Sequence, residues 1–329
     1  MRASDATDRR TIGGVRVRPF ANVGGVVWIA EPEGVAPALS LWWQAHRHEL
    51  AGLLRRVGGL LLRGFHVSGT EAFADFVDEA LIPAAYVYRS TPRTELGERV
   101  YTATEYPAER TIPLHCENAY QDTWPRWLLF YCDQPARSGG ETPLADVAEV
   151  TRNLPEVLKE TFATRRVKYV RNYRDGLDLP WQTVFDTDAR CEVEAYCRRH
   201  RISWTWVGDD GLRTEQVCDA MVRHPVTGDM LWFNQAHLFH VSNLDDATRS
   251  ALLSIYAKEE LPRHACFGDG SAIEPDMLAC IRDVYARHAQ SFPWHRTDAL
   301  LIDNLAVAHG RYPFRGERHV LVAMGELRR

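Results

Sequence analysis

The chain has 329 residues, of which 45% are hydrophobic and 25% are charged, values that indicate a globular protein and not a disordered or fibrous one. Its 39 basic and 44 acidic residues give a net charge of −5, so no basic excess predicts binding to nucleic acid. A run of about 18 apolar residues, as a membrane span requires, is absent.

The seven cysteines form no CxxC pair, and the first twenty residues have no apolar core of a secretory signal. We interpret the cysteines as reduced thiols of a cytoplasmic protein.

Apolar periodicity and turn residues predict alternating helices and strands. Residues 1–15 are expected to be a flexible polar tail, and the segments that follow are a strand at 26–29, a helix at 40–57, a strand at 60–65 and a helix at 70–80. From residue 101 to 146 short apolar runs between Pro and Gly favour strands, for example at 127–132. Beyond them we expect helices at 155–164, 187–200, 245–259 and 274–290, and strands at 166–173, 299–304 and 318–324.

No internal repeat, low-complexity stretch or Ser/Gly linker divides the chain. Residues 1–329 are therefore predicted to form a single domain.

Several common catalytic motifs are missing. The sequence contains no GxxxxGK[ST] loop, no GxGxxG, no GxSxG and no HExxH. Nucleotide-phosphate binding through a P-loop and hydrolysis by a serine nucleophile are not predicted.

The segment IPLHCENAY places His115 and Glu117 two residues apart. On a strand, residues i and i+2 point to the same face, so an imidazole and a carboxylate would lie side by side. A second histidine from another strand would complete a two-histidine, one-carboxylate set with open metal positions, as non-haem Fe(II) oxygenases use. The pair alone is weak evidence, because short motifs of this kind arise by chance.

Longer stretches add specificity. The sequence resembles the TauD/TfdA family of Fe(II)/2-oxoglutarate-dependent dioxygenases, and most of all its SyrP-like branch of amino-acid hydroxylases. The stretches that carry this resemblance are LHCENAYQDTWP, SGGETPLAD, KYVRNY, HPVTGDMLWFNQAHLFH, FGDGSAIE and DNLAVAHGRYPFRGER. The implied fold is α+β: a double-stranded β-helix, or jelly roll, with flanking helices and a large insertion at about residues 150–300 that shapes the substrate site.

The resemblance also implies site residues. His115, Glu117 and His309 match the iron ligands, Thr142 and Arg318 match the residues that hold 2-oxoglutarate, and no further catalytic residue is implied. An arginine suits that role, because a planar guanidinium grips a carboxylate with two parallel hydrogen bonds. Arg311 and Arg315 are rivals for it.

Related halogenases lack the carboxylate ligand and leave room for chloride. Glu117 stands where much of the family has aspartate, and it favours oxygen insertion over halogenation. Of the 13 histidines in the chain, only His115 and His309 are predicted to bind metal.

Other residues flank the metal segment or lie in the resembling stretches. Candidates for the substrate site are Asn118, Tyr120, Arg171, Phe233, Asn234 and Arg311, with Gln235 beside them. For each, packing or backbone hydrogen bonding is an equally good explanation. His237 and His240 are interpreted as structural, Asp303 and Asn304 as orienting.

We therefore expect an enzyme that uses Fe(II), 2-oxoglutarate and O₂ to hydroxylate an unactivated C–H of an amino acid or amino-acid-like unit in secondary metabolism, with release of succinate and CO₂. The substrate would be a small molecule, free or tethered to the carrier protein of a peptide synthetase. One alternative is desaturation or another oxidation of a small acidic substrate, such as a sulfonate, phosphonate or carboxylate. Weaker alternatives are a Zn²⁺-dependent hydrolase and a non-catalytic jelly-roll binding module.

Overall fold

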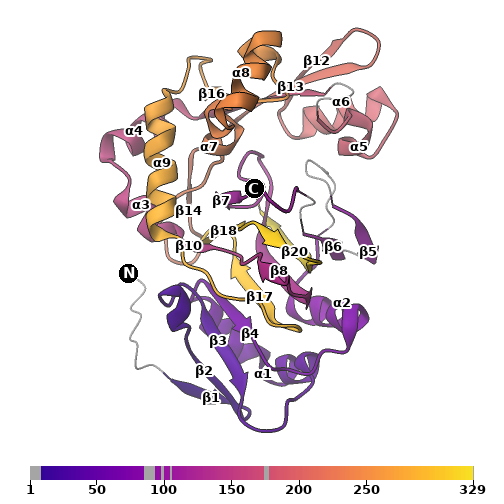
Figure 1. The fold of residues 1–329 in the computed structure, drawn as a ribbon, viewed down its shortest axis with the longest axis vertical. Coiled ribbons are helices and arrows are strands. Elements are labelled where there is room, and N and C mark those ends of the chain that lie inside the picture. Colours follow the sequence, from indigo (N-terminus) through magenta and orange to yellow (C-terminus); the bar gives the residue numbers. More distant parts are fainter. Residues whose placement is uncertain (1–8, 85–92, 98–99, 104–105, 174–177, 329) are drawn as a thin grey trace.

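Two β-sheets form the centre of the molecule (Figure 1). The structure, a computed structural model, describes residues 9–84, 93–97, 100–103, 106–173 and 178–328. The larger sheet has nine strands in the order β1 (Arg10–Ile12), β2 (Val15–Pro19), β3 (Trp28–Pro32), β4 (Gly59–Leu62), β17 (Ala299–Asp303), β8 (Trp124–Gln134), β20 (His319–Arg328), β6 (Val100–Thr102) and β5 (Glu95–Gly97). The smaller sheet has three, β10 (Leu144–Asp146), β18 (Val307–Arg311) and β7 (Ile112–His115), and a short ribbon pairs β9 (Ser138–Gly139) with β19 (Phe314–Arg315).

The chain crosses repeatedly from one sheet to the other. β7 lies in the small sheet, β8 in the large one and β10 in the small one again; near the C-terminus β17, β18 and β20 alternate in the same way. This alternation of antiparallel strands between two facing sheets is a jelly roll. The predicted fold class, an α+β protein with a jelly-roll core, is confirmed.

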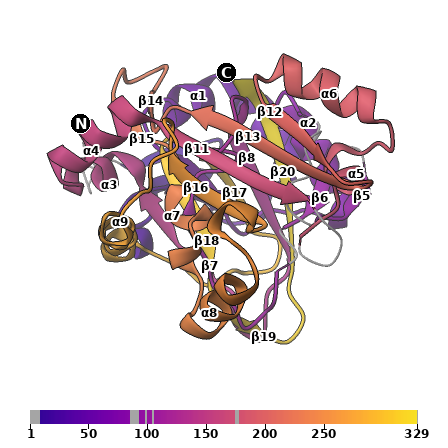
Figure 2. The same ribbon diagram turned by 90° about the horizontal axis from the view of Figure 1, so that it is seen from above.

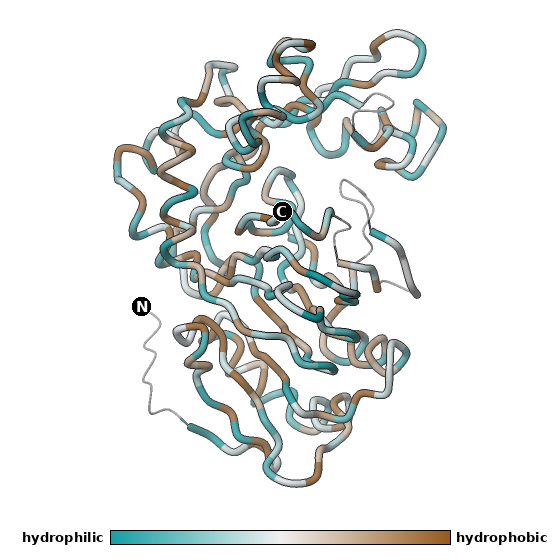
Figure 3. The backbone as a smooth tube through the Cα atoms, in the orientation of Figure 1, coloured by the Kyte–Doolittle hydropathy of each residue, from teal (hydrophilic) through white to brown (hydrophobic). Residues whose placement is uncertain are grey.

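An apolar core fills the space between the sheets. Phe130 and Leu300 from the large sheet pack with Leu144 and Val307 from the small one, and all four are buried. β17 and the middle of β8 are continuous apolar runs, as expected for strands covered on both faces. Figure 3 shows these central strands largely in the colours of apolar residues.

The outer face of the large sheet is covered by helices α1 (Leu39–Leu54) and α2 (Gly69–Ala80). Their apolar residues recur at helical spacing, and Phe73 stacks on Tyr131 of β8 with ring centroids 4.7 Å apart. The expectation of a flexible tail over residues 1–15 is wrong for its second half. Residues 10–12 form strand β1, where Ile12 is buried and its carbonyl accepts a hydrogen bond from the indole of Trp42. Residues 1–8 lie outside the described residues.

A long insertion separates β10 from β17 and covers one end of the jelly roll (Figures 1 and 2). Its centre is a four-stranded sheet in the order β12 (Ser203–Val207), β13 (Gly211–Cys218), β11 (Val167–Tyr173) and β16 (Arg263–Phe267). Around it lie the hairpin β14 (Met221–Arg223) and β15 (Met230–Trp232), and the helices α3 (Val147–Asn153), α4 (Glu156–Arg165), α5 (Trp181–Phe185), α6 (Arg190–Arg199), α7 (Ala236–Phe239), α8 (Asp246–Ile255) and α9 (Pro275–His288). The organisation of the whole chain as one domain stays a prediction.

No helix in the described part of the chain combines the length and the apolar character needed to cross a membrane.

Candidate metal centre

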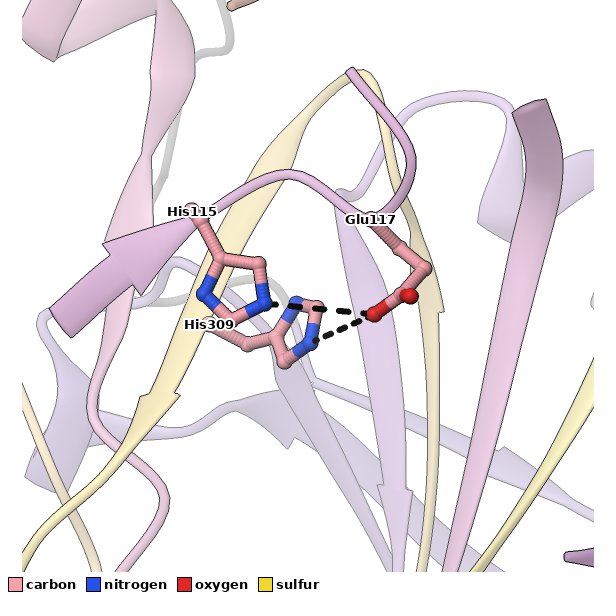
Figure 4. A group of neighbouring side chains, drawn as sticks. All are labelled: His115, Glu117 and His309. Atoms are coloured by element: carbon pink, nitrogen blue, oxygen red, sulfur yellow. Dashed lines mark ion pairs between the residues drawn. The ribbon is translucent and has the colours of Figure 1, made fainter. Parts of the chain in front are cut away.

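The small sheet and the turn after β7 bring His115, Glu117 and His309 together (Figure 4). β7 pairs with β18 in a register that sets His115 opposite His309. Glu117 Oε2 lies 3.9 Å from His115 Nε2 and 3.8 Å from His309 Nε2, and the three potential ligand atoms all lie within 4.8 Å of one another. Among the described residues this is the only such group of three or more His, Cys, Asp or Glu side chains.

One detail of the expected geometry is wrong. β7 ends at His115, so Glu117 lies in the turn after the strand and not on its face. The next residue, Asn118, has a positive φ of 57°, a conformation that asparagine tolerates and that ends the strand. Cys116 is buried in the apolar core of the insertion and is not part of the ligand group.

The protonation states suit a metal. The Nδ1 atom of His115 lies 2.8 Å from the carbonyl oxygen of Pro113, so it carries the proton and leaves Nε2 with a lone pair toward Glu117. Burial and the neighbouring His115 hold the pKa of His309 well below its usual value, which keeps this ring neutral. Burial would raise the pKa of Glu117, but Arg93 and the two histidines hold it below its usual range. Two neutral imidazoles and one carboxylate are the donor set that a divalent transition metal requires.

Asn304 fixes the backbone of the carboxylate ligand. Its Oδ1 accepts the Glu117 N–H at 2.7 Å, and its Nδ2 donates to the carbonyls of Glu117 and Pro125, both at 2.9 Å. The side chain is fully buried, and both the oxygen and the nitrogen of its amide form hydrogen bonds. The preceding residue, Asp303, accepts hydrogen bonds from buried His224 and from Arg126. The expected orienting role of Asp303 and Asn304 thus has a physical basis.

The insertion holds the same strand from its other side. Gln235 Nε2 donates to the carbonyl of Cys116 at 2.6 Å, and His237 Nε2 lies 3.0 Å from the carbonyl of Leu114. Burial lowers the pKa of His237 to about 4, so the ring is neutral and Nε2 carries the proton. These carbonyls flank His115, and the insertion therefore contacts the metal segment directly and does not merely cover it.

The residues expected to hold 2-oxoglutarate lie in one corner of the jelly roll. Arg318 immediately precedes β20 and donates from Nε to the carbonyl of Gly140 at 2.9 Å. No carboxylate of the described residues forms a salt bridge with it, and burial, helped by Arg311, lowers its pKa to about 10, which leaves it charged at neutral pH. Thr142 is buried, and the indole N–H of Trp294 donates to its Oγ1 at 3.0 Å, which leaves the hydroxyl proton available to a ligand.

Gly140 is required for this corner. Its φ of 76° is in the left-handed region, and a Cβ atom there would lie 3.0 Å from Arg318 Cδ and 3.0 Å from Phe314 Cβ. The Gly-Gly pair of the SGGETPLAD stretch therefore allows the arginine to lie against the backbone. Trp294 is buried and orients Thr142, a role that no sequence motif indicates.

Two of the expected substrate residues, Asn118 and Tyr120, lie in the turn after Glu117, and a third, Arg171, lies in the insertion sheet. The Tyr120 hydroxyl donates to Asn118 Oδ1 at 3.3 Å, and the Tyr120 ring packs against Phe239 at 4.9 Å. Arg171, on β11, is buried and pairs with Asp178 at 3.4 Å. Arg263 on the neighbouring strand grips the same carboxylate with two hydrogen bonds of 2.8 and 3.1 Å. Two arginines therefore share one acidic partner here.

The side chains of the other three are engaged in the fold. Arg311 donates to the backbone carbonyls of residues 106, 107 and 110. Asn234 donates to the carbonyl of Ala220 and accepts the N–H of Ala236 at the start of α7. Phe233 packs against Trp124 at 5.1 Å and lines a cavity of about 490 Å³ between the turn after Glu117 and the insertion sheet.

Arg93 was not predicted. Its guanidinium donates to Glu117 Oε2 at 3.1 Å, and the two side chains are only 4% and 6% exposed. A single arginine far from the recognisable stretches carries no sequence signal, and only the tertiary fold brings it to the ligand group.

The chain matches the family described as "Taurine catabolism dioxygenase TauD, TfdA family" over residues 18–324. The protein belongs to this family. It is an Fe(II)- and 2-oxoglutarate-dependent dioxygenase. The group of His115, Glu117 and His309 agrees with this activity, and so does Arg318, which forms no salt bridge with a described carboxylate. The hydrolase and binding-module alternatives are wrong.

Among its relatives, the dapdiamide synthesis protein DdaC of Enterobacter agglomerans is 42% identical over 278 residues, which are 84% of each chain. The structure of PvcB from Pseudomonas aeruginosa, described as an Fe, α-ketoglutarate dependent oxygenase from an isonitrile synthetic pathway, has a TM-score of 0.55 at 17% identity and covers 97% of this chain and 98% of its own. An asparagine oxygenase solved with Fe(II), 2S,3S-3-hydroxyasparagine and succinate has a TM-score of 0.54 at 13% identity, with 98% and 87% coverage. These two likenesses concern the fold.

Proposed function

We propose that the protein hydroxylates an unactivated C–H of an amino acid or amino-acid-like unit in secondary metabolism, with release of succinate and CO₂. His115, Glu117 and His309 would hold Fe(II), which supplies the oxidising chemistry when it is bound together with 2-oxoglutarate and O₂. Arg318 and Thr142 would hold the distal carboxylate of 2-oxoglutarate. The observation that carries the proposal is this ligand group with a charged, half-buried Arg318 that has no acidic partner among the described residues.

The kind of substrate rests on two supports. DdaC, 42% identical, is by its name a protein of a synthetic pathway, and the asparagine oxygenase was solved with a hydroxylated amino acid. In the insertion, Arg171 and Arg263 both contact Asp178, and a guanidinium of this group suits a carboxylate of the substrate. Glu117 fills the position that a halogenase would leave for chloride.

The remaining residues act by position. Tyr120 and Asn118 lie next to Glu117 and would contact the substrate near the metal, whereas Gln235, His237 and Asn304 keep the ligands in place. The seven cysteines are all unpaired, which supports a reducing, cytoplasmic location.

The test is succinate formation and O₂ uptake with Fe(II) and 2-oxoglutarate, with free amino acids screened one at a time and the same amino acids loaded on a carrier protein in a parallel series. Mass spectrometry of the product decides the outcome: a gain of one oxygen supports hydroxylation. Loss of two hydrogens would instead favour desaturation, which needs the same residues. Absence of 2-oxoglutarate turnover with every substrate, and absence of 2-oxoglutarate binding, would overturn the proposal.

A further inference from the structure

A positively charged side chain, Arg93, lies at the metal centre but is not one of the potential metal ligands. Arg93 donates to Oε2 of Glu117, the same oxygen that both histidine Nε2 atoms face at 3.8 and 3.9 Å. The guanidinium therefore contacts the carboxylate oxygen that faces the two histidines.

Burial makes this arrangement costly unless it is compensated. Arg93 and Glu117 are 4% and 6% exposed, and a guanidinium keeps its charge in the protein interior. Without a metal, Arg93 neutralises Glu117. A divalent metal would add two positive charges to this pair, so the group would carry a net charge of +2.

Such a group attracts an anion. A guanidinium is well suited to bind such an anion, because its planar N–H donors match the two oxygens of a carboxylate. Arg318 does not take this role, because it lies beside Gly140 at the corner expected for the distal end of 2-oxoglutarate. Arg311 does not take it either, because three backbone carbonyls engage its guanidinium.

We infer that Arg93 is a binding residue for a carboxylate that lies at the metal, and that it moves part of its hydrogen bonding from Glu117 to this carboxylate when the metal is loaded. This inference rests on the proposed function of the site. Two sources have the same chemistry: the keto-acid end of 2-oxoglutarate and the carboxylate of a free amino-acid substrate.

The two possible roles of Arg93 predict opposite effects on metal binding. If Arg93 only positions Glu117, its removal weakens the metal site. If it is a carboxylate receptor, its removal takes a positive charge away from the metal, so that metal affinity stays the same or rises while carboxylate affinity falls.

The experiment uses Arg93→Gln, which removes the charge but keeps a hydrogen-bond donor, and Arg93→Lys, which keeps the charge but not the planar fork. Calorimetry measures first the binding of Mn(II), then of 2-oxoglutarate to the Mn(II)-loaded protein, then of each free proteinogenic L-amino acid to the Mn(II)/2-oxoglutarate form. Arg63→Gln is the matched control, because Arg63 forms a buried pair with Asp298 at 2.6 Å outside the metal centre.

For Arg93→Gln we expect Mn(II) affinity unchanged or a few-fold higher, and carboxylate affinity lower by about tenfold or more, the size of one lost charge-assisted hydrogen bond. Arg93→Lys should lie between the wild type and Arg93→Gln, and Arg63→Gln should change neither affinity. A loss confined to 2-oxoglutarate identifies the cosubstrate as the source of the carboxylate, and a loss confined to the amino acid identifies the substrate.

Lower Mn(II) affinity of Arg93→Gln with intact carboxylate binding would overturn the inference and leave Arg93 a positioning residue. If the wild type itself fails to bind 2-oxoglutarate in the presence of Mn(II), the proposed function fails independently of Arg93. Thermal unfolding of each metal-free variant checks that the fold is intact.

Discussion

The metal segment and the insertion differ in the partners of their buried polar side chains. In the metal segment, the carbonyls of Leu114, Cys116 and Glu117 each accept a hydrogen bond from a buried side chain, so the ligands have little freedom. In the insertion, polar residues pair with one another, as Arg171 and Arg263 do with Asp178. Hydrogen bonds to the backbone hold the metal ligands in one position, which the reaction requires. Pairs between side chains in the insertion can change by substitution without moving the ligands.

The largest effect should follow from loss of the carboxylate ligand. Glu117→Ala removes the only anionic donor of the centre and leaves Arg93 beside the metal position without its partner, so metal affinity and succinate formation should both fall by more than about 100-fold. Anaerobic Fe(II) titration and succinate assays measure this. Glu149→Ala, at an exposed position on α3, is the control. Full 2-oxoglutarate turnover by Glu117→Ala would contradict the metal assignment.

The next largest effect should be on the binding of 2-oxoglutarate, without a change in metal binding. Arg318→Ala would remove the guanidinium proposed to hold the distal carboxylate, and we expect KM for 2-oxoglutarate to rise by about 100-fold with little change in Fe(II) affinity. Arg315→Ala provides the matched control, because this arginine is exposed on β19 and was a rival for the same role. An equal rise in KM for both variants would assign the binding to the loop and not to Arg318.

Much of this site was predictable from the sequence because its residues are close to strands with a fixed register. His115 and His309 lie opposite each other on β7 and β18, and Arg318 contacts Gly140, two residues before Thr142. Most helices and strands were also placed within a few residues; α9, for example, occupies 275–288 within the predicted 274–290. Apolar periodicity carries this information, because each element buries one face.

The rest depends on tertiary contacts. Glu117 leaves the strand because Asn118 adopts a positive φ, which no spacing rule detects. Residues 10–12 looked like a polar tail, although Ile12 is buried in a strand pair with β2. Arg93 reaches Glu117 across 24 residues, and its neighbours in sequence say nothing of that contact.

A smaller effect on the metal is expected from the backbone clamp. Asn304→Asp replaces the donor to the carbonyls of Glu117 and Pro125 with a second acceptor, so the ligand turn should loosen and metal affinity should fall by about 10- to 100-fold. Asn172→Asp is matched to it, because Asn172 is also buried and also donates to two backbone carbonyls, those of Glu259 and Leu261, but within the insertion. Comparable Mn(II) affinity of the two variants would show that the clamp serves folding only.

The buried histidine His240 of the insertion should make the folded protein less stable at acidic pH. Burial, then His264 and the nearby Lys258 and Arg282, lowers the pKa of His240 to about 4 from its usual 6.5. The ring is neutral in the folded protein while the unfolded chain takes up a proton below pH 6.5, so stability is complete above that pH and is lost as the pH falls toward 4. The loss should be on the order of 1–3 kcal/mol.

Urea unfolding of the metal-free protein at pH 7 and pH 5 measures this loss, and His240→Gln should show a smaller difference between the two pH values than the wild type. Gln can accept the Ser242 N–H that His240 Nδ1 accepts at 3.1 Å, so the variant tests titration and not the loss of a contact. The same pH slope in both proteins would place the acid sensitivity outside His240. A reduced slope would assign part of the acid sensitivity to His240, and thus to the insertion that covers the jelly roll.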